Sequence, residues 1–339
     1  MAYFDSYIKI TVQFFLEFFS KLKLTADAKI ETVAKTVRHT VITNCTNRKL
    51  FPVTPQLRAS GLATGEALAV CKEWFDWVAQ APFVASAKGL YAGRTFREAE
   101  LASNILDARL MVVSAGLGLV DGSTKLPSYS LTLMGPAADA VLPKMGGRSE
   151  EWWSALSTLS PFTSSIEDNG LILAALSAPY LEMVAEDWAK WPTAQLSRLR
   201  LFTKEPCATL PAGLRDQCMP YDDRLDQIPG GYAGTQSDFA QRALRHFAEQ
   251  FVQLPGNGAT HARQVADLMS SYTPTERPDR PKKLDAEIVE LILRDWDLVD
   301  GRSGEMLKHL RREVGIACEQ GRFKTLFKSA ATLRQGALL

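Results

Sequence analysis

Short, strongly apolar segments separated by helical stretches limit what this chain can fold into. Arg109–Ser114 is almost continuously apolar, and residues 170–176 repeat the pattern. Such runs are typical of strands buried on both faces of a parallel sheet. Residues 39–43 and 199–203 are two further expected strands. Helical patterns separate the strands, at about residues 64–79, 95–108 and 179–190. This alternation predicts an α/β fold, with a mainly parallel sheet flanked by helices.

Three parts are expected along the chain. Residues 1–37 form an N-terminal helical segment whose apolar face either packs on the next domain or binds a partner or a membrane surface. Residues 38–272 form the α/β domain. Residues 273–339 begin with a proline-rich linker and continue as a helical region with a break at Gly315. From Arg302 onward, eight Lys or Arg side chains stand against three Glu, which favours an anionic partner at this end.

Several classes of protein are disfavoured. The five cysteines are scattered and include no Cys-x-x-Cys pair, so we expect reduced thiols in a cytoplasmic protein. The four histidines lack a His-Glu-x-x-His spacing, so we expect no metal and no other cofactor. Residues 10–16 and 169–181 are too short for a membrane span, so no membrane partner is expected.

Residues 43–49 (Thr-Asn-Cys-Thr-Asn-Arg-Lys) follow the first expected strand. Ligands of open parallel sheets bind where loops leave the carboxyl ends of strands. The Asn44 and Asn47 amides both donate and accept hydrogen bonds, and Cys45, Arg48 and Lys49 add a thiol and two cations. This set suits the edge of a base or sugar beside a developing anion. The alternative is an ordinary polar turn.

Residues 114–121 (Ser-Ala-Gly-Leu-Gly-Leu-Val-Asp) follow the second expected strand. Gly116 and Gly118 resemble the start of a dinucleotide-binding fingerprint, but Asp121 replaces its third glycine and Pro127 forbids the helix that must follow. A nicotinamide-dependent oxidoreductase is therefore disfavoured. Asp121 is suited to orienting water or stabilising a cationic transition state, and Tyr129 to stacking on a planar ring. The alternative is a plain Asp-Gly turn.

Residues 112–121 and 126–132 together resemble the signature of YaaA-related domains of phages and anti-phage gene clusters. Residues 43–49 match the Cys-x-x-x-Lys pattern of that group, and residues 91–94 and 175–180 fall where it has intermediate motifs. The similarity covers roughly residues 38–250. Ser130 departs from the pattern, because that group more often has Asp there, which leaves Asp121 as the better acid. The resemblance implies a fold like that of uracil-DNA glycosylases.

The activity that this resemblance implies is removal of a modified base, glucosylated hydroxymethylcytosine, from phage DNA by a metal-free DNA glycosylase acting as a monomer. Cleavage passes through a cationic sugar, and the target base must leave the helix. Asp121 would then face the sugar and Asn44 the base, as the two catalytic residues. The residues expected to bind the substrate are Cys45, Asn47, Lys49, Arg94, Ser114, Gly116, Gly118, Tyr129, Ser177 and Tyr180.

Contacts to double-stranded DNA are expected in two places. A glycine-rich loop opens a helix whose N-terminus would favour a phosphate, with Ser237 as its N-cap. The residues expected there are Gly231, Gly234, Thr235, Ser237 and Arg242. The basic C-terminal region is the second place, as a helix-turn-helix-like grip. The residues expected in it are Arg311, Arg312, Arg322, Lys324 and Lys328. In both places the alternative is a core helix with a solvated polar face.

Two other functions remain open. One is a nucleoside or nucleotide transferase on the same architecture, with Cys45 as the covalent nucleophile. The other is a DNA-binding stress or defence protein without enzymatic activity.

Overall fold

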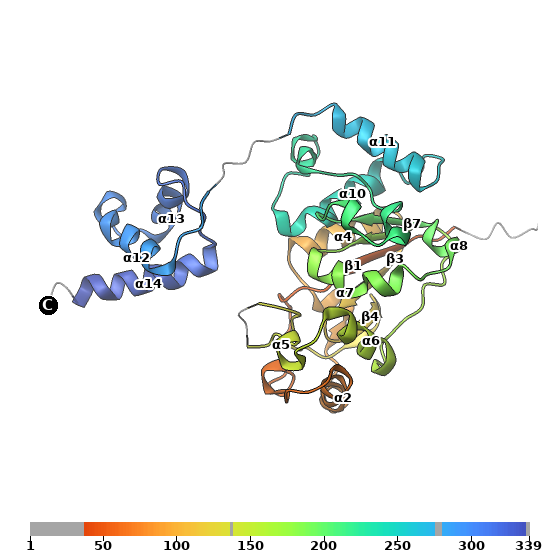
Figure 1. Cartoon of the computed structure of the whole chain (residues 1–339), viewed down its shortest axis with the longest axis horizontal. Coiled ribbons are helices and arrows are strands. Elements are labelled where there is room, and N and C mark those ends of the chain that lie inside the picture. The colour runs from red at the N-terminus through yellow and green to blue at the C-terminus, as the bar shows by residue number, and fades with distance from the viewer. Residues whose placement is uncertain (1–36, 136–137, 275–279, 337–339) are drawn as a thin grey trace, which may run out of the picture. The chain divides into compact units, whose positions relative to one another are not determined.

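A computed structural model describes residues 37–135, 138–274 and 280–336, in two compact units that divide between Thr273 and Pro274 (Figure 1). The division lies in the stretch where the linker is expected. The expected N-terminal helix, residues 3–36, lies outside the described residues.

The first unit is built on a five-stranded sheet in the order β4-β3-β1-β6-β7. Four strands are parallel, and only β4 runs antiparallel, beside β3. The expected α/β fold with a mainly parallel sheet is thus confirmed. The strands are β1 (Thr40–Asn44), β3 (Arg109–Ser114), β4 (Gly118–Asp121), β6 (Ile172–Ala175) and β7 (Leu199–Phe202). Nearly all their residues are buried, because helices cover both faces.

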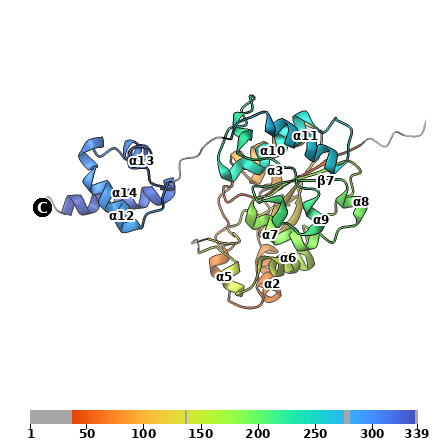
Figure 2. The same cartoon turned by 45° about the horizontal axis from the view of Figure 1, so that its top comes forward.

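Long helices cover the sheet on both sides (Figures 1 and 2). One face carries α4 (Arg94–Ile105) and α10 (Phe239–Gln250), with α11 (Gly258–Ser270) beyond α10. The other face carries α2 (Ala67–Val78), α6 (Ser149–Leu159) and α7 (Ala178–Trp188). Short elements complete the unit: a two-stranded ribbon of β2 (Ala85–Ser86) and β5 (Lys125–Leu126), and the helices α3 (Ala87–Leu90), α5 (Leu142–Met145), α8 (Thr193–Leu196) and α9 (Ala212–Arg215).

The order of the parallel strands places a ligand site. Across the sheet, the four parallel strands lie in the order β3-β1-β6-β7. The chain runs from β1 to β3 on one side and then crosses back to β6 on the other side of β1, so the switch point of the sheet lies between β1 and β6. In open α/β sheets, ligands bind outside the carboxyl ends of the strands at this switch point. β1 ends at Asn44 and β6 at Ala175, and their residues are paired in register along the sheet.

The second unit is a small helical unit with a core of its own. It contains α12 (Asp285–Arg294), α13 (Ser303–Arg312) and α14 (Gln320–Gly336). The apolar side chains of the three helices meet, with Ile288, Met306 and Phe323 almost fully buried. Gly315 lies between α13 and α14 with φ of +73°, a conformation that glycine adopts without strain, and the expected break is confirmed there.

The cysteine prediction is wrong for one pair. Cys207 and Cys218 form a disulfide that links the segment after β7 to the segment after α9, while Cys45, Cys71 and Cys318 are free and buried. The two cysteines are eleven residues apart, without a spacing pattern that the sequence alone could have revealed. Within the described part of the chain, no helix is long and apolar enough to cross a membrane.

Candidate active site at the carboxyl edge of the sheet

A compact group of polar side chains lies where β1, β3 and β6 end. We call it the strand-end cluster, and its members are Cys45, Lys49, Tyr91, Ser114, Tyr129 and Tyr180. The Cys45 thiol lies 3.1 Å from the Tyr180 hydroxyl, which joins the loop after β1 to the first turn of α7, the helix that follows β6. The Cys45 sulfur also accepts a long hydrogen bond of 3.5 Å from the Ala115 amide beyond β3. The thiol therefore sits at the switch point and touches all three connections.

Hydroxyl groups form the second half of the cluster. The Tyr129 hydroxyl lies 2.6 Å from Ser114 Oγ and 2.8 Å from the Tyr91 hydroxyl. Burial raises the pKa of Tyr91, Tyr129 and Tyr180, so all three phenols are neutral at physiological pH. Such a network can donate and accept hydrogen bonds but carries no negative charge.

Lys49 supplies the positive charge of the cluster, and backbone pairing holds it in place. The Leu50 amide donates to the Leu90 carbonyl at 2.9 Å, and the Ala92 amide donates to the Arg48 carbonyl at 3.0 Å. These bonds place Lys49 directly opposite Tyr91 on the same side of the paired segments. Its Nζ lies 4.4 Å from the centre of the Tyr129 ring and 5.8 Å from that of Tyr91. Burial lowers the pKa of this ammonium, so its proton is easier to transfer.

Asn44, predicted to hold the base, has its amide engaged inside the protein. Its Oδ1 accepts hydrogen bonds from the Ser177 amide at 3.1 Å and from Gln241 Nε2 at 3.2 Å. Its Nδ2 donates to the Cys45 carbonyl at 3.0 Å. These bonds join β1 to the start of α7 and to α10, so Asn44 and Ser177 position the loops of the site. Asn47 is exposed beside them.

The second predicted loop is not an open loop. β3 turns back through Ala115-Gly116-Leu117 into β4, and the turn is completely buried. The Trp74 and Trp152 indoles donate to the Gly116 and Ala115 carbonyls, both at 2.7 Å. Ser114 Oγ accepts from the Leu117 amide at 3.0 Å. The substrate-binding roles predicted for Gly116 and Gly118 are therefore replaced by structural ones.

Asp121 lies at the other end of the sheet from the strand-end cluster. Because β4 runs antiparallel, Asp121 pairs with Met111 near the start of β3. Its carboxylate accepts hydrogen bonds from Arg109 Nε at 2.5 Å and from the Ser123 amide at 2.8 Å, and the hydrogen bonds from Ser123 and Arg109 lower its pKa although burial opposes the shift. The prediction that Asp121 and Asn44 face one substrate is therefore wrong.

The glycine-rich loop is held by the chain's own carboxylates, not left open for a phosphate. Asp238 accepts a hydrogen bond from the Thr235 amide at 2.9 Å, and Asp226 accepts one from the Gly234 amide at 3.3 Å. Arg242, predicted to bind DNA, is fully buried and donates to both carboxylates at 2.7 Å. Thr235 and Asp238 form the capping box at this end, instead of the predicted N-cap Ser237.

The remaining members of that predicted set stay near the loop. Gly231, Thr235 and Ser237 are exposed. Arg94, predicted to bind the substrate, begins α4 at the carboxyl edge of the sheet, and its Nη2 donates to the Ala233 carbonyl at 2.7 Å. Arg94 thus connects the start of α4 to the glycine-rich loop.

The basic residues predicted in the C-terminal region divide into two kinds. Arg311 donates to the Cys318 carbonyl at 2.7 Å, and Arg322 forms an ion pair with Asp285, so both support the fold of the second unit. Arg312, Lys324 and Lys328 are exposed.

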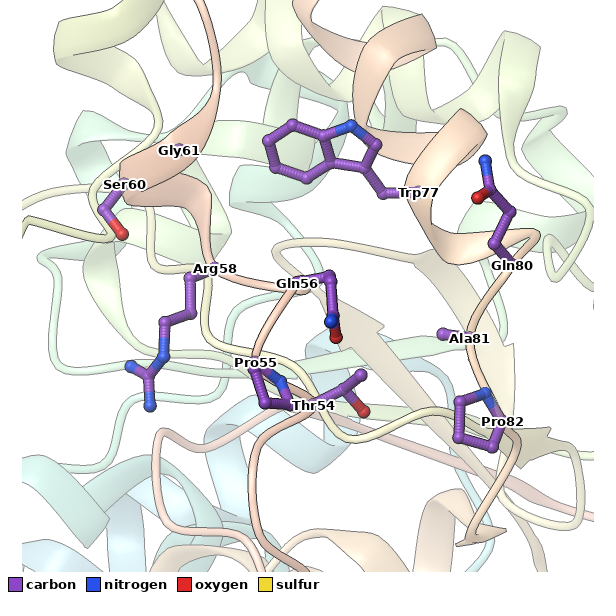
Figure 3. A pocket seen from close by; sticks show the side chains of 10 residues that line it. All are labelled: Thr54, Pro55, Gln56, Arg58, Ser60, Gly61, Trp77, Gln80, Ala81 and Pro82. Atoms are coloured by element: carbon purple, nitrogen blue, oxygen red, sulfur yellow. The ribbon is translucent and has the colours of Figure 1, made fainter.

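A hollow of about 720 Å3 lies farther along the loop that carries Lys49. Residues 54–61 form one wall, and the other is formed by Trp77 and Gln80 with the following Ala81 and Pro82 (Figure 3). The Thr54 amide donates to the Ser128 carbonyl at 2.9 Å, so the residue next to Tyr129 backs the first wall. The volume is in the range of small-molecule sites.

Two side chains at the strand ends, Tyr91 and Gln241, are not predictable from the sequence pattern. Tyr91 was noted only within a motif, and its apolar surroundings gave no sign of the hydroxyl network. Gln241 lies on α10, almost two hundred positions after β1, and it donates to the Ala175 carbonyl at 3.0 Å as well as to Asn44. Its Oε1 is buried without a hydrogen-bond partner among the described residues. Only the fold brings these side chains to the strand ends.

Comparisons with known proteins find no relatives: no family model, no curated protein and no solved structure matches the chain. Among the described residues, no group of three or more His, Cys, Asp or Glu side chains is arranged to hold a metal ion.

Proposed function

We propose that the chain is a DNA glycosylase and that the strand-end cluster is its active site. The observation that carries this proposal is the Lys49 ammonium, held over the Tyr129 ring beside Cys45 and Tyr180 at the switch point of the sheet. A partly desolvated cation next to neutral hydroxyl groups suits a reaction in which negative charge develops on a leaving group.

The chemistry assigned to Lys49 is that of a general acid. When the bond between C1′ and the base nitrogen breaks, its electron pair goes to the base. Lys49 transfers a proton to the departing base, and water then attacks C1′. The lowered pKa of Lys49 favours this transfer, because an acid works best when its pKa is near the working pH.

In this proposal Asp121 does not stabilise the sugar cation, because its carboxylate is bonded to Arg109 at the other end of the sheet. The phosphates on either side of the deoxyribose supply the nearest negative charge. Binding energy from those phosphates then stabilises the cationic transition state, which links catalysis to DNA binding.

The proposed substrate is glucosylated hydroxymethylcytosine, a base that carries a bulky, polar modification. The hollow in Figure 3 supports this choice, because an indole, two glutamines and a threonine suit the apolar and hydroxyl-bearing faces of a sugar. One wall of the hollow belongs to the loop that carries Lys49.

DNA contact is proposed for the exposed cations of the second unit, Arg312, Lys324 and Lys328. Each phosphate contact that is lost should reduce by about one the slope of the logarithm of the binding constant against the logarithm of the salt concentration. The proposed enzyme acts as a monomer in the cytoplasm, where phage DNA is met.

The direct test is incubation of the protein with glucosylated phage DNA and with unmodified DNA, followed by alkali. Strand breaks only in the glucosylated DNA are expected. Lys49→Met should lower the rate by at least about a hundredfold, since general acids contribute factors of this size. Lys72→Met on exposed α2 is the matched control and should be fully active. Absence of abasic sites in both DNAs would contradict the proposal and favour a DNA-binding protein without enzymatic activity.

The second candidate is a nucleoside or nucleotide transferase with Cys45 as the nucleophile. It is favoured by the contacts of the Cys45 sulfur with the Tyr180 hydroxyl and the Ala115 amide, both potential donors to a thiolate. Cys45→Ala separates the candidates: loss of a covalent nucleophile abolishes turnover, whereas the glycosylase keeps measurable activity because its general acid is Lys49.

A further inference from the structure

We propose that Lys49 also forms a covalent imine with C1′ of an abasic deoxyribose, which gives the protein a strand-cleaving lyase activity. This inference rests on the proposed function, because it places a DNA sugar at the strand-end cluster. It adds a second reaction, in which the lysine acts as a nucleophile and not only as an acid.

The bonding of Lys49 differs from that of the ion-paired lysines Lys72, Lys283 and Lys308. Lys72, Lys283 and Lys308 lie within 2.8 Å of a carboxylate oxygen and have side chains at least 38% exposed. Lys49 is half-buried, and among the described residues no carboxylate lies within ion-pair distance of it. Its Nζ has one long hydrogen bond, 3.4 Å to the Thr46 carbonyl, and otherwise faces aromatic rings. A lysine with a purely structural role in such a place would be expected to have an acidic partner.

Cys45 and Asp139 both act to raise the pKa of Lys49, against the effect of burial, and Asp139 is already engaged elsewhere. It accepts hydrogen bonds from Ser130 Oγ at 2.6 Å and from the Ser60 amide at 3.0 Å, and Arg58 lies 3.5 Å away. Cys45 and Asp139 together do not outweigh the effect of burial, which lowers the pKa of Lys49. A desolvated amine without an acidic partner is the form in which lysine attacks carbonyl carbon.

The neutral amine that attacks C1′ is produced by the base-excision step itself. Transfer of the Lys49 proton to the departing base leaves the amine unprotonated at the moment when C1′ becomes a hemiacetal carbon. The sugar ring opens to an aldehyde, and the amine lone pair forms a bond to C1′. The aldehyde oxygen leaves as water, with one proton from the amine and one from solvent, and a protonated imine remains.

Strand cleavage follows from the imine without any oxidant or reductant. Water takes a proton from C2′, the C2′–C3′ double bond forms, and the C3′–O bond breaks. The phosphate leaves with that electron pair as the 5′ end of the downstream fragment. Hydrolysis of the imine then releases the unsaturated sugar and restores Lys49.

Backbone pairing makes the lysine a fixed nucleophile. The two hydrogen bonds that join residues 48 and 50 to residues 92 and 90 hold the Lys49 backbone, and the faces of Tyr91 and Tyr129 limit its side chain. A nucleophile held in this way loses little entropy when it reacts.

The test supplies the abasic site ready-made, so that it does not depend on base excision. A duplex with one abasic site, prepared from a uracil-containing oligonucleotide, is incubated with the full chain and sodium cyanoborohydride, which reduces an imine to a stable amine. A protein–DNA adduct is expected, and peptide mapping of the wild-type adduct should place the DNA on Lys49. Without the reductant, strand cleavage at the abasic site is expected.

Matched variants complete the test. Lys49→Arg keeps the cation but cannot form the imine, so the adduct should fall by at least about tenfold. Lys72→Arg should leave it unchanged. No adduct with the wild-type chain, or an adduct spread over other lysines, overturns the proposal, and mapping decides this even if Lys49→Arg unfolds. Base excision without an adduct removes only the lyase, whereas an adduct without base excision keeps the imine and contradicts the glycosylase.

Discussion

The thiol of Cys45 lies 3.1 Å from the hydroxyl of Tyr180. Cys45 is the first residue after β1, and Tyr180 lies in the first turn of α7, so this contact closes the switch point between β1 and β6. Cys45 is buried and Tyr180 is half-buried, and each is a hydrogen-bonding partner that the other would lose on substitution.

A double-mutant cycle should show that this contact is shared. Tyr180→Phe is expected to lower the free energy of unfolding by about 1 kcal/mol, because the thiol loses its partner. Cys45→Ala should also destabilise the protein, but the double variant should lose less than the sum of the two single losses. Urea unfolding measures the three values. Strictly additive losses would mean that the contact contributes nothing.

Much of the sheet could be predicted because local pattern determined it. Arg109–Ser114 was expected with its observed bounds, and β1, β6 and β7 lie within a residue or two of their predicted positions. β3 and β6 are buried and mostly apolar, whereas β1 and β7 also contain buried polar side chains, such as Thr43 and Arg200. β4 was missed because Gly118-Leu119-Val120-Asp121 is short and begins with a glycine, at φ of +82°, that looks like part of a loop.

The site could be predicted only in part, because its partners are distant in sequence. Cys45, Lys49, Ser114, Tyr129 and Tyr180 follow strand ends, and strand order brings them together. Asp121 was misplaced because the expected loop is a hairpin, which carries the carboxylate back along β3. Arg242 was expected at the surface because Asp226 meets it only through the fold, although Asp238 lies four residues before it at the start of the same helix.

Arg242→Ala should destabilise the first unit strongly. The guanidinium is fully buried between Asp226 and Asp238, and its removal leaves buried negative charge without its main partner. A loss of about 3–5 kcal/mol is expected. Arg97→Ala, on the exposed side of α4, is the control and should change stability by less than about 0.5 kcal/mol. Weaker DNA binding by Arg242→Ala with unchanged stability would support the original surface assignment.

Gly116→Ala should show how tightly the β3–β4 turn is packed. A Cβ at this position would lie 2.9 Å from Cε2 of Tyr129, a member of the strand-end cluster. Overpacking of this kind costs about 1–3 kcal/mol, and displacement of Tyr129 should also reduce activity. Gly304→Ala in α13 has open space around the added methyl group and should be neutral or slightly stabilising. Thermal unfolding and the alkali assay measure the two effects, and equal behaviour of both variants would contradict the packing argument.

Stability should fall with acid before most carboxylates titrate, because of His246. Burial lowers the pKa of His246 to about 4, and the charge of Arg245 acts in the same direction. An unfolded histidine titrates near 6.5, so between pH 6.5 and 4 the unfolded chain binds more protons than the folded one. The free energy of unfolding should therefore decrease as the pH falls through this range. The share of the slope that comes from His246 corresponds to up to about one more proton bound by the unfolded chain than by the folded one.

His246→Asn tests this assignment without removing the local hydrogen bond. His246 Nδ1 lies 2.8 Å from the Tyr221 hydroxyl, and an asparagine amide can take the place of that nitrogen without titrating. Burial also lowers the pKa of His39 and His261, so part of the slope should remain in the variant. Urea unfolding at several pH values between 4 and 7 should show a flatter dependence for His246→Asn than for the wild-type chain. Parallel curves would mean that the pKa of His246 is the same in the folded and the unfolded chain, which its burial beside Arg245 opposes.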